Sequence, residues 1–288
     1  MLLPDAPVGI FDSGVGGLSV LRHIQARLPH EHLLYLADTG FAPYGDKPES
    51  VVVERVLAVG DFLRAQGAKA LVVACNTATV AAVRELRERH PCMPIVGVEP
   101  GLKPAAALTR SGKVGVLATG RTLRGAKFLL LRDQIHLDSG AEFLLQPCIG
   151  LADQIEFGER DSPATSAMLE RFIMPLLAQG ADTLVLGCTH YPLVRAAIER
   201  LLRQAGRPDV ALVDTGDAVA RQLARLLVGA ALLRTTGAAP IEPATLRAYT
   251  SASAAALTAA FNGLLGLDPP VHEVALPLPT TWPPVARI

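Results

Sequence analysis

The chain has 288 residues, 50% of them hydrophobic, and its 27 basic and 27 acidic residues give a formal net charge of zero. This length suffices for one large or two ordinary domains with a substantial core, and the hydrophobic content excludes a generally disordered chain. The zero net charge gives no indication of a nucleic-acid partner, and the longest apolar runs are too short to cross a membrane.

Short apolar runs alternate with helical patterns along the chain, which is typical of β-α units and a parallel sheet, so the fold class is α/β. Strands are expected at residues 8–11, 33–36, 70–74, 95–98, 114–117, 143–145, 184–186 and 212–214. Between them, apolar residues recur at helical spacing, as at Val52, Val56, Val59 and Leu63. The last segment carries a further strand and helix, and the Pro-rich stretch at 277–284 is expected to be irregular.

The second half of the chain repeats the first in outline. Residues 114–120 resemble residues 8–14, and the runs that end at Cys75 and Cys188 resemble each other. Two further pairs, 31–35 with 141–145 and 98–99 with 213–214, occur in the same order, which favours duplication over chance likeness of strands. We expect two similar α/β domains, 1–98 with about 209–288 and 99–208, and a site in the cleft between them.

The four cysteines lie far apart, at positions 75, 92, 148 and 188, and form no CxxC motif. A chain this long does not need a disulfide framework, and the first residues lack the pattern of a signal peptide. We therefore expect free thiols in a cytoplasmic protein. No His, Cys and Asp cluster has metal-ligand spacing, so no metal site is predicted.

A glycine-rich loop, Ser13-Gly-Val-Gly-Gly17, follows the first expected strand. It lacks the Gly-Lys-Ser/Thr of a phosphate-binding loop and the third glycine of the dinucleotide fingerprint. We interpret it as a tight turn that brings backbone N–H groups near a small anion.

Ligands of parallel α/β sheets bind at the carboxyl ends of the strands, so the polar residues that follow each strand are the candidates. These residues are Asp12, Ser13, Cys75, Asn76, Thr77, Cys188, Thr189 and His190. The asparagine and threonines also suit helix N-caps, and a cysteine after a buried strand is often only a small apolar residue. Two cysteines in matched positions, one beside a histidine, instead favour a pair of opposed acid/base groups. Cys92 and Cys148 lack this context and are expected to be structural.

Several stretches resemble the cofactor-independent aspartate/glutamate racemase superfamily, and within it the glutamate racemases. They are Phe11-Asp-Ser-Gly-Val-Gly-Gly-Leu-Ser19, Pro43-Tyr-Gly45, Ala74-Cys-Asn-Thr-Ala78, Gly97-Val-Glu-Pro100 and Gly187-Cys-Thr-His-Tyr-Pro192. The resemblance spans about residues 8 to 220. It implies two α/β domains that bind L- or D-glutamate between them and transfer a proton at the α-carbon without pyridoxal phosphate or metal. It also implies a bacterial cytoplasmic enzyme that supplies D-glutamate for peptidoglycan. It leaves the oligomeric state open, a homodimer included.

The same resemblance implies roles for individual residues. Cys75 would take the α-proton from D-glutamate with help from Asp12, and Cys188 would take it from L-glutamate with help from His190 and Glu156. The substrate would be held by Asp12, Ser13, Tyr44, Gly45, Asn76, Thr77, Thr119, Thr122, Thr189 and His190. Arg121, Gly125, Phe128 and the order Pro147-Cys148 depart from the family pattern, and all lie in the second domain.

Three other functions fit parts of this pattern. A racemase for another acidic amino acid, such as aspartate, would need the same pair of thiols. A non-catalytic amino-acid-binding protein could use the same two-domain cleft, but it would leave the paired cysteines without a role. A thiol–disulfide oxidoreductase would also use two cysteines, although usually within a CxxC motif.

Overall fold

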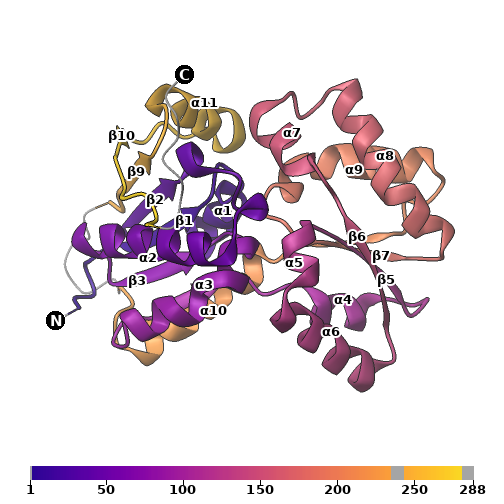
Figure 1. Cartoon of the computed structure of the whole chain (residues 1–288), viewed down its shortest axis with the longest axis horizontal. Helices are drawn as coiled ribbons and strands as arrows, with labels where there is room; N and C mark the ends of the chain where they lie inside the picture. Colours follow the sequence, from indigo (N-terminus) through magenta and orange to yellow (C-terminus); the bar gives the residue numbers. More distant parts are fainter. Residues whose placement is uncertain (1, 235–242, 281–288) are drawn as a thin grey trace.

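The computed structural model describes residues 2–234 and 243–280, so the last part of the Pro-rich stretch, residues 281–284, lies outside the described residues. The chain forms two α/β lobes, each built on a parallel sheet with helices on both faces (Figure 1). None of the helices in the described ranges is long and apolar enough to cross a membrane.

The first lobe contains a six-stranded parallel sheet in the order β10-β9-β2-β1-β3-β4. Its strands are β1 (Val8–Asp12), β2 (Leu33–Ala37), β3 (Ala70–Val73), β4 (Ile95–Gly97), β9 (Leu246–Thr250) and β10 (Val271–Glu273). Alternate residues of each strand face opposite helical layers. Ile10 packs with α1 (Leu18–Arg27), α10 (Gly216–Gly229) and α11 (Ala254–Leu265), whereas Phe11 packs with α2 (Glu49–Ala65) and α3 (Asn76–Arg89).

The second lobe contains a four-stranded parallel sheet in the order β6-β5-β7-β8. Its strands are β5 (Lys113–Ala118), β6 (Glu142–Pro147), β7 (Thr183–Leu186) and β8 (Ala211–Val213). Its helices are α4 (Leu102–Leu108), α5 (Gly120–Arg124), α6 (Ala126–Ser139), α7 (Leu151–Phe157), α8 (Pro163–Ala178) and α9 (Arg195–Gln204). The order of these four strands repeats β2-β1-β3-β4 of the first lobe, and the prediction of two pseudo-symmetric α/β domains is confirmed.

The chain leaves the first lobe after β4 and returns to it before α10, which packs against α1. The sequence placed the return near residue 209, yet β8 pairs with β7 in the second sheet. We therefore propose a boundary just after Val213, where the chain leaves that sheet.

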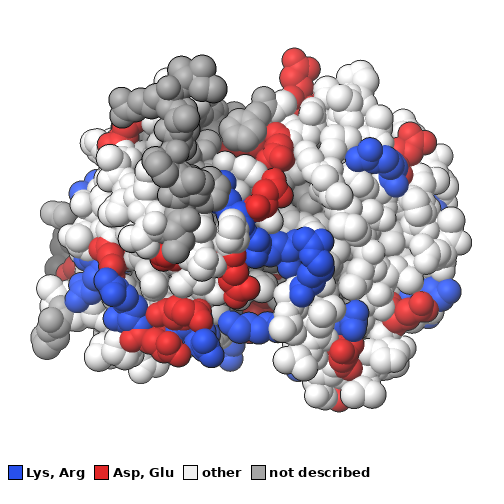
Figure 2. All heavy atoms as spheres, in the orientation of Figure 1, with Lys and Arg blue, Asp and Glu red and all other residues white. Residues whose placement is uncertain are grey.

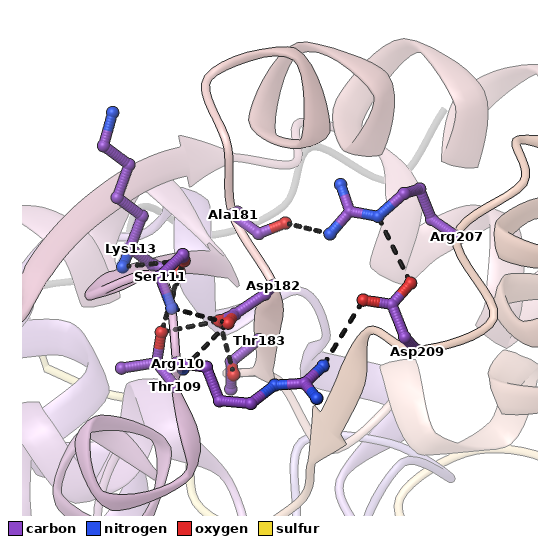
Figure 3. Close-up of polar contacts among 9 residues, drawn as sticks. All are labelled: Thr109, Arg110, Ser111, Lys113, Ala181, Asp182, Thr183, Arg207 and Asp209. Carbon is purple, nitrogen blue, oxygen red and sulfur yellow. Dashed lines mark hydrogen bonds and ion pairs between the residues drawn. The ribbon is translucent and has the colours of Figure 1, made fainter.

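A network of hydrogen bonds surrounds Asp182 at the amino-terminal edge of the second sheet, opposite the carboxyl ends of its strands (Figure 3). The Asp182 carboxylate accepts hydrogen bonds from the Thr109 hydroxyl at 2.5 Å and from the backbone N–H groups of Arg110 and Ser111 at 2.8 and 2.7 Å. Burial opposes ionisation, but these donors prevail and lower the pKa of Asp182 to about 2. The network fixes the loop between α4 and β5 to the start of β7.

Candidate active site

A cavity of about 400 Å³ lies between the lobes, at the carboxyl ends of both sheets. The first lobe lines it with Ser13, Gly14, Ala42, Pro43, Tyr44, Gly45, Asp46, Cys75, Asn76 and Thr77. The second lobe lines it with Thr119, Gly120, Arg121, Arg124, Pro147, Cys148, Ile149, Gly150, Ala152, Asp153, Glu156, Cys188, Thr189 and His190. Charged side chains gather where the lobes meet, while much of the visible surface of the second lobe is uncharged (Figure 2). The expected cleft therefore exists, and both matched cysteines line it.

Cys75 precedes the first residue of α3, and its side chain is almost fully buried. Its sulfur lies 3.6 Å from the Ser13 hydroxyl, so Ser13 is its direct polar partner. Burial and then the nearby Asp12 carboxylate raise the pKa of the Cys75 thiol to about 12. The Cys75 thiol is therefore protonated at neutral pH and can act as an acid.

Cys188 is also buried, but its polar surroundings differ. The His190 Nδ1 atom lies 3.6 Å from its sulfur, and His190 Nε2 lies 2.7 Å from Glu156 Oε2. Burial alone would lower the pKa of His190, but its contacts with Cys188 and Glu156 raise that pKa well above the usual value. The raised pKa favours the cationic form of the imidazole, which lies in contact with the Cys188 sulfur.

The glycine-rich turn brings the lobes into direct contact. The Val15 N–H donates to Glu156 of the second lobe, at 3.0 and 2.9 Å from its two carboxylate oxygens. A Cβ at Gly14 would lie 2.4 Å from Glu156 Oε1, and one at Gly16 would lie 2.5 Å from His190 Nδ1. Glycine at both positions leaves room for these two side chains. The sequence predicted that backbone N–H groups of this turn lie near a small anion. In the structure, the anion beside the Val15 N–H is the Glu156 carboxylate.

Asp12 lies behind the same turn and not on the cavity surface. Its Oδ2 atom accepts the Gly17 N–H at 2.9 Å, and its Oδ1 atom lies 3.4 Å from the Thr189 hydroxyl. Burial raises the pKa of Asp12, His190 opposes this rise, and Glu156 adds to it. Asp12 therefore joins the turn of the first lobe to the Cys-Thr-His segment of the second.

Three threonines form a row from one lobe to the other. Thr77 Oγ1 lies 3.4 Å from Thr119 Oγ1, which lies 3.0 Å from Thr122 Oγ1. Thr119 caps α5 by accepting the Thr122 N–H. Beside them, the buried Asn76 Nδ2 has no hydrogen-bond partner among the described residues, and so remains available as a donor for a bound molecule.

The structure brings eleven of the predicted site residues to the cavity wall and places two, Asp12 and Thr122, one contact behind it. It also adds residues that the sequence left out. Cys148, expected to be structural, lines the cavity, as do Arg121, Arg124 and Asp153. Arg121 reaches across the cleft and donates to the carbonyl oxygens of Gly45 and Lys47. One indication of this contact was present in the sequence: position 121 carries an arginine where the family pattern has another residue.

Comparison with known proteins agrees with this architecture. Residues 16–223 match the Asp/Glu/Hydantoin racemase family, and the chain belongs to that family. It is an amino-acid racemase, and so an isomerase. A glutamate racemase of Pseudomonas aeruginosa is 54% identical over 252 residues, which cover 88% of this chain and 91% of the relative.

Solved structures of glutamate racemases share the fold. Isoform RacE1 from Bacillus anthracis matches with a TM-score of 0.83 at 31% identity, covering 95% of this chain and 98% of that chain. The Escherichia coli glutamate racemase, solved in complex with L-glutamate and the activator UDP-MurNAc-ala, matches with a TM-score of 0.80 at 32% identity, covering 94% and 99%.

Proposed function

We propose that the chain interconverts L- and D-glutamate by direct proton transfer at the α-carbon, with Cys75 and Cys188 as the two acid/base groups. The observation that carries this proposal is the placement of two buried thiols, from matched strand ends of two lobes, on one cavity. The relatives named above support glutamate as the substrate. The enzyme would act in the cytoplasm and supply D-glutamate for peptidoglycan, as the resemblance implies.

The electrostatics of the two thiols suit the reaction that starts from L-glutamate. Cys188, with His190 beside it, takes the α-proton as a thiolate, and the Cys75 thiol delivers its proton to the opposite face. In the reverse reaction the two groups exchange roles. Glu156 positions and charges the imidazole, and Ser13 contacts the Cys75 sulfur.

The negative charge that develops beside the α-carboxylate needs donors that are already in place. The start of α3 offers the N–H groups of its first turn and the free Nδ2 of Asn76, and the Thr77, Thr119 and Thr189 hydroxyls lie on the same cavity. Burial of these groups strengthens each interaction, because less water competes for them. We assign them to the substrate carboxylates.

A racemisation assay tests the proposal. Purified protein, with no cofactor added, is mixed with L-glutamate or D-glutamate, and circular dichroism follows the loss of optical activity. We expect both enantiomers to approach the same racemic end point. Parallel assays with L- and D-aspartate test the rival substrate. Binding of glutamate without any change in its chirality would contradict the proposal and favour a binding protein.

A further inference from the structure

A buried carboxylate lies behind the cavity wall, at a position to which the proposed mechanism gives no role. Asp38 follows β2, has an exposed fraction of 0%, and accepts hydrogen bonds from three side chains. Its Oδ2 atom lies 2.6 Å from the Tyr44 hydroxyl, and its Oδ1 atom lies 2.7 Å from the Ser251 hydroxyl. The Arg55 guanidinium binds both oxygens, with Nε at 2.7 Å and Nη2 at 2.6 Å.

Arg55 connects this carboxylate to the C-terminal part of the chain. It belongs to α2, and its Nη1 atom donates to the carbonyl oxygens of Leu276 and Pro277 at 3.2 and 2.8 Å. Its guanidinium also lies over the Phe41 ring, 4.8 Å from the centroid. A planar group with several fixed donors can hold all these partners at once, which an ammonium cannot do.

Tyr44 connects Asp38 to the cavity, because it contacts Asp38 and also lines the cavity wall. Its side chain is buried, and it lines the cavity together with Pro43 and Gly45. Because the phenol donates its only proton to Asp38, Tyr44 meets a bound molecule through its ring and its backbone. The depth of this loop in the cavity is therefore set from behind by Asp38.

We propose that Asp38 and Arg55 are positioning residues for the substrate, which hold the loop at residues 42–47 at the depth that glutamate requires. Neither side chain lines the cavity, so both act through Tyr44. The inference rests on the proposed function. It adds that residues 276–277 help to position the substrate-binding loop, because their two carbonyl oxygens accept hydrogen bonds from Arg55.

Steady-state kinetics with both enantiomers of glutamate test this inference on the full-length enzyme. Asp38→Asn keeps the shape but removes the charge, and Arg55→Lys keeps the charge but removes the planar set of donors. We expect KM to rise about tenfold for Asp38→Asn and about threefold or more for Arg55→Lys, with kcat within about twofold of wild type, because lost ground-state binding appears in KM. Asp61 lies on the same α2 helix as Arg55 and forms an exposed ion pair with Arg89 of α3. Asp61→Asn is therefore the matched control and should change neither constant.

Thermal unfolding separates positioning from a purely structural role. A purely structural role predicts a lower melting temperature and an unchanged KM for the folded fraction, and that result would overturn the inference. If Asp38→Asn and Arg55→Lys do not fold, Ser251→Ala decides, since it leaves Asp38 and Arg55 in place and removes one hydrogen bond to Asp38 and one from the Gly40 N–H. A raised KM supports the inference and an unchanged KM overturns it. Wild-type enzyme assayed in parallel reports on the proposed function separately.

Discussion

Cys75 and Cys188 occupy matched positions in the two lobes, but they have different partners. Cys75 lies at the start of a helix beside a hydroxyl group and a buried carboxylate, and its pKa is raised to about 12. Cys188 is followed by a turn and then the 3₁₀-helix Tyr191–Val194, and it has beside it the His190 imidazole, whose pKa is raised. The two similar lobes thus place two thiols at matched positions, while the surrounding residues differ: a hydroxyl and a carboxylate near Cys75, and an imidazole beside Cys188.

Replacement of either cysteine by alanine should abolish racemisation in both directions, because each direction of the reaction needs one acid and one base. We expect Cys75→Ala and Cys188→Ala each to lose at least about 4 kcal/mol of transition-state stabilisation, roughly a thousandfold in rate. Cys92→Ala, which changes an exposed thiol, is the control and should retain full activity. If Cys75→Ala or Cys188→Ala keeps more than about a tenth of wild-type turnover, the two-thiol mechanism is wrong.

The residues that directly follow a strand were predictable from the sequence, because the carboxyl ends of parallel strands meet at one edge of a sheet. Ser13, Cys75, Asn76, Cys188 and His190 were found by this rule. Glu156 lies on α7, away from any strand end, and only the family resemblance indicated it. Asp38 also directly follows a strand, β2, but it was not selected among the polar residues at strand ends. No local pattern predicted Arg55, because its contacts with residues 276–277 are remote in sequence.

At the scale of elements, the strands of the first 214 residues were found, and the two strands of the C-terminal part were not located. All eight strands expected between residues 8 and 214 exist, and no end differs from its expected position by more than two residues. β9 and β10 were not located, although one further strand was expected near the C-terminus. β10 has only three residues, two of them exposed, at the edge of the sheet. A strand with so little buried surface leaves almost no apolar pattern to recognise.

The Asp182 network predicts how the second lobe responds to pH. Because the pKa of Asp182 is lowered to about 2 from 3.8, its contribution to stability is complete above about pH 4 and is lost as the pH falls from about 4 to 2. Asp182→Asn should therefore lower the free energy of unfolding by about 2 kcal/mol at pH 7, and by much less near pH 2. Urea denaturation at several pH values measures this difference.

Asp133→Asn is the control for this experiment, because Asp133 forms an exposed ion pair with Arg132 in the same lobe. Exposed pairs contribute little to stability, so the control should unfold nearly as the wild type does at every pH. An Asp182→Asn variant with wild-type stability at pH 7 would show that the network does not stabilise the lobe.

At the scale of the whole molecule, the reaction needs both lobes at once. Each lobe contributes one thiol, and contacts across the cleft join them: Val15 with Glu156, Asp12 with Thr189, and Arg121 with the loop at residues 42–47. Because the thiols come from different lobes, they can approach the α-carbon from opposite faces. The product then receives its proton from the second thiol, and not the proton that the first thiol removed.

Isotope incorporation tests this geometry. In D₂O, the thiol that delivers the new proton carries deuterium from the solvent, so newly formed D-glutamate should be almost fully deuterated at the α-carbon. The remaining L-glutamate should stay largely protonated, because the abstracting thiol tends to return the proton it took. The same pattern is expected when the reaction starts from D-glutamate. Mass spectrometry of the separated enantiomers at early times measures it, and substantial protium in the early product would mean that a single base serves both faces.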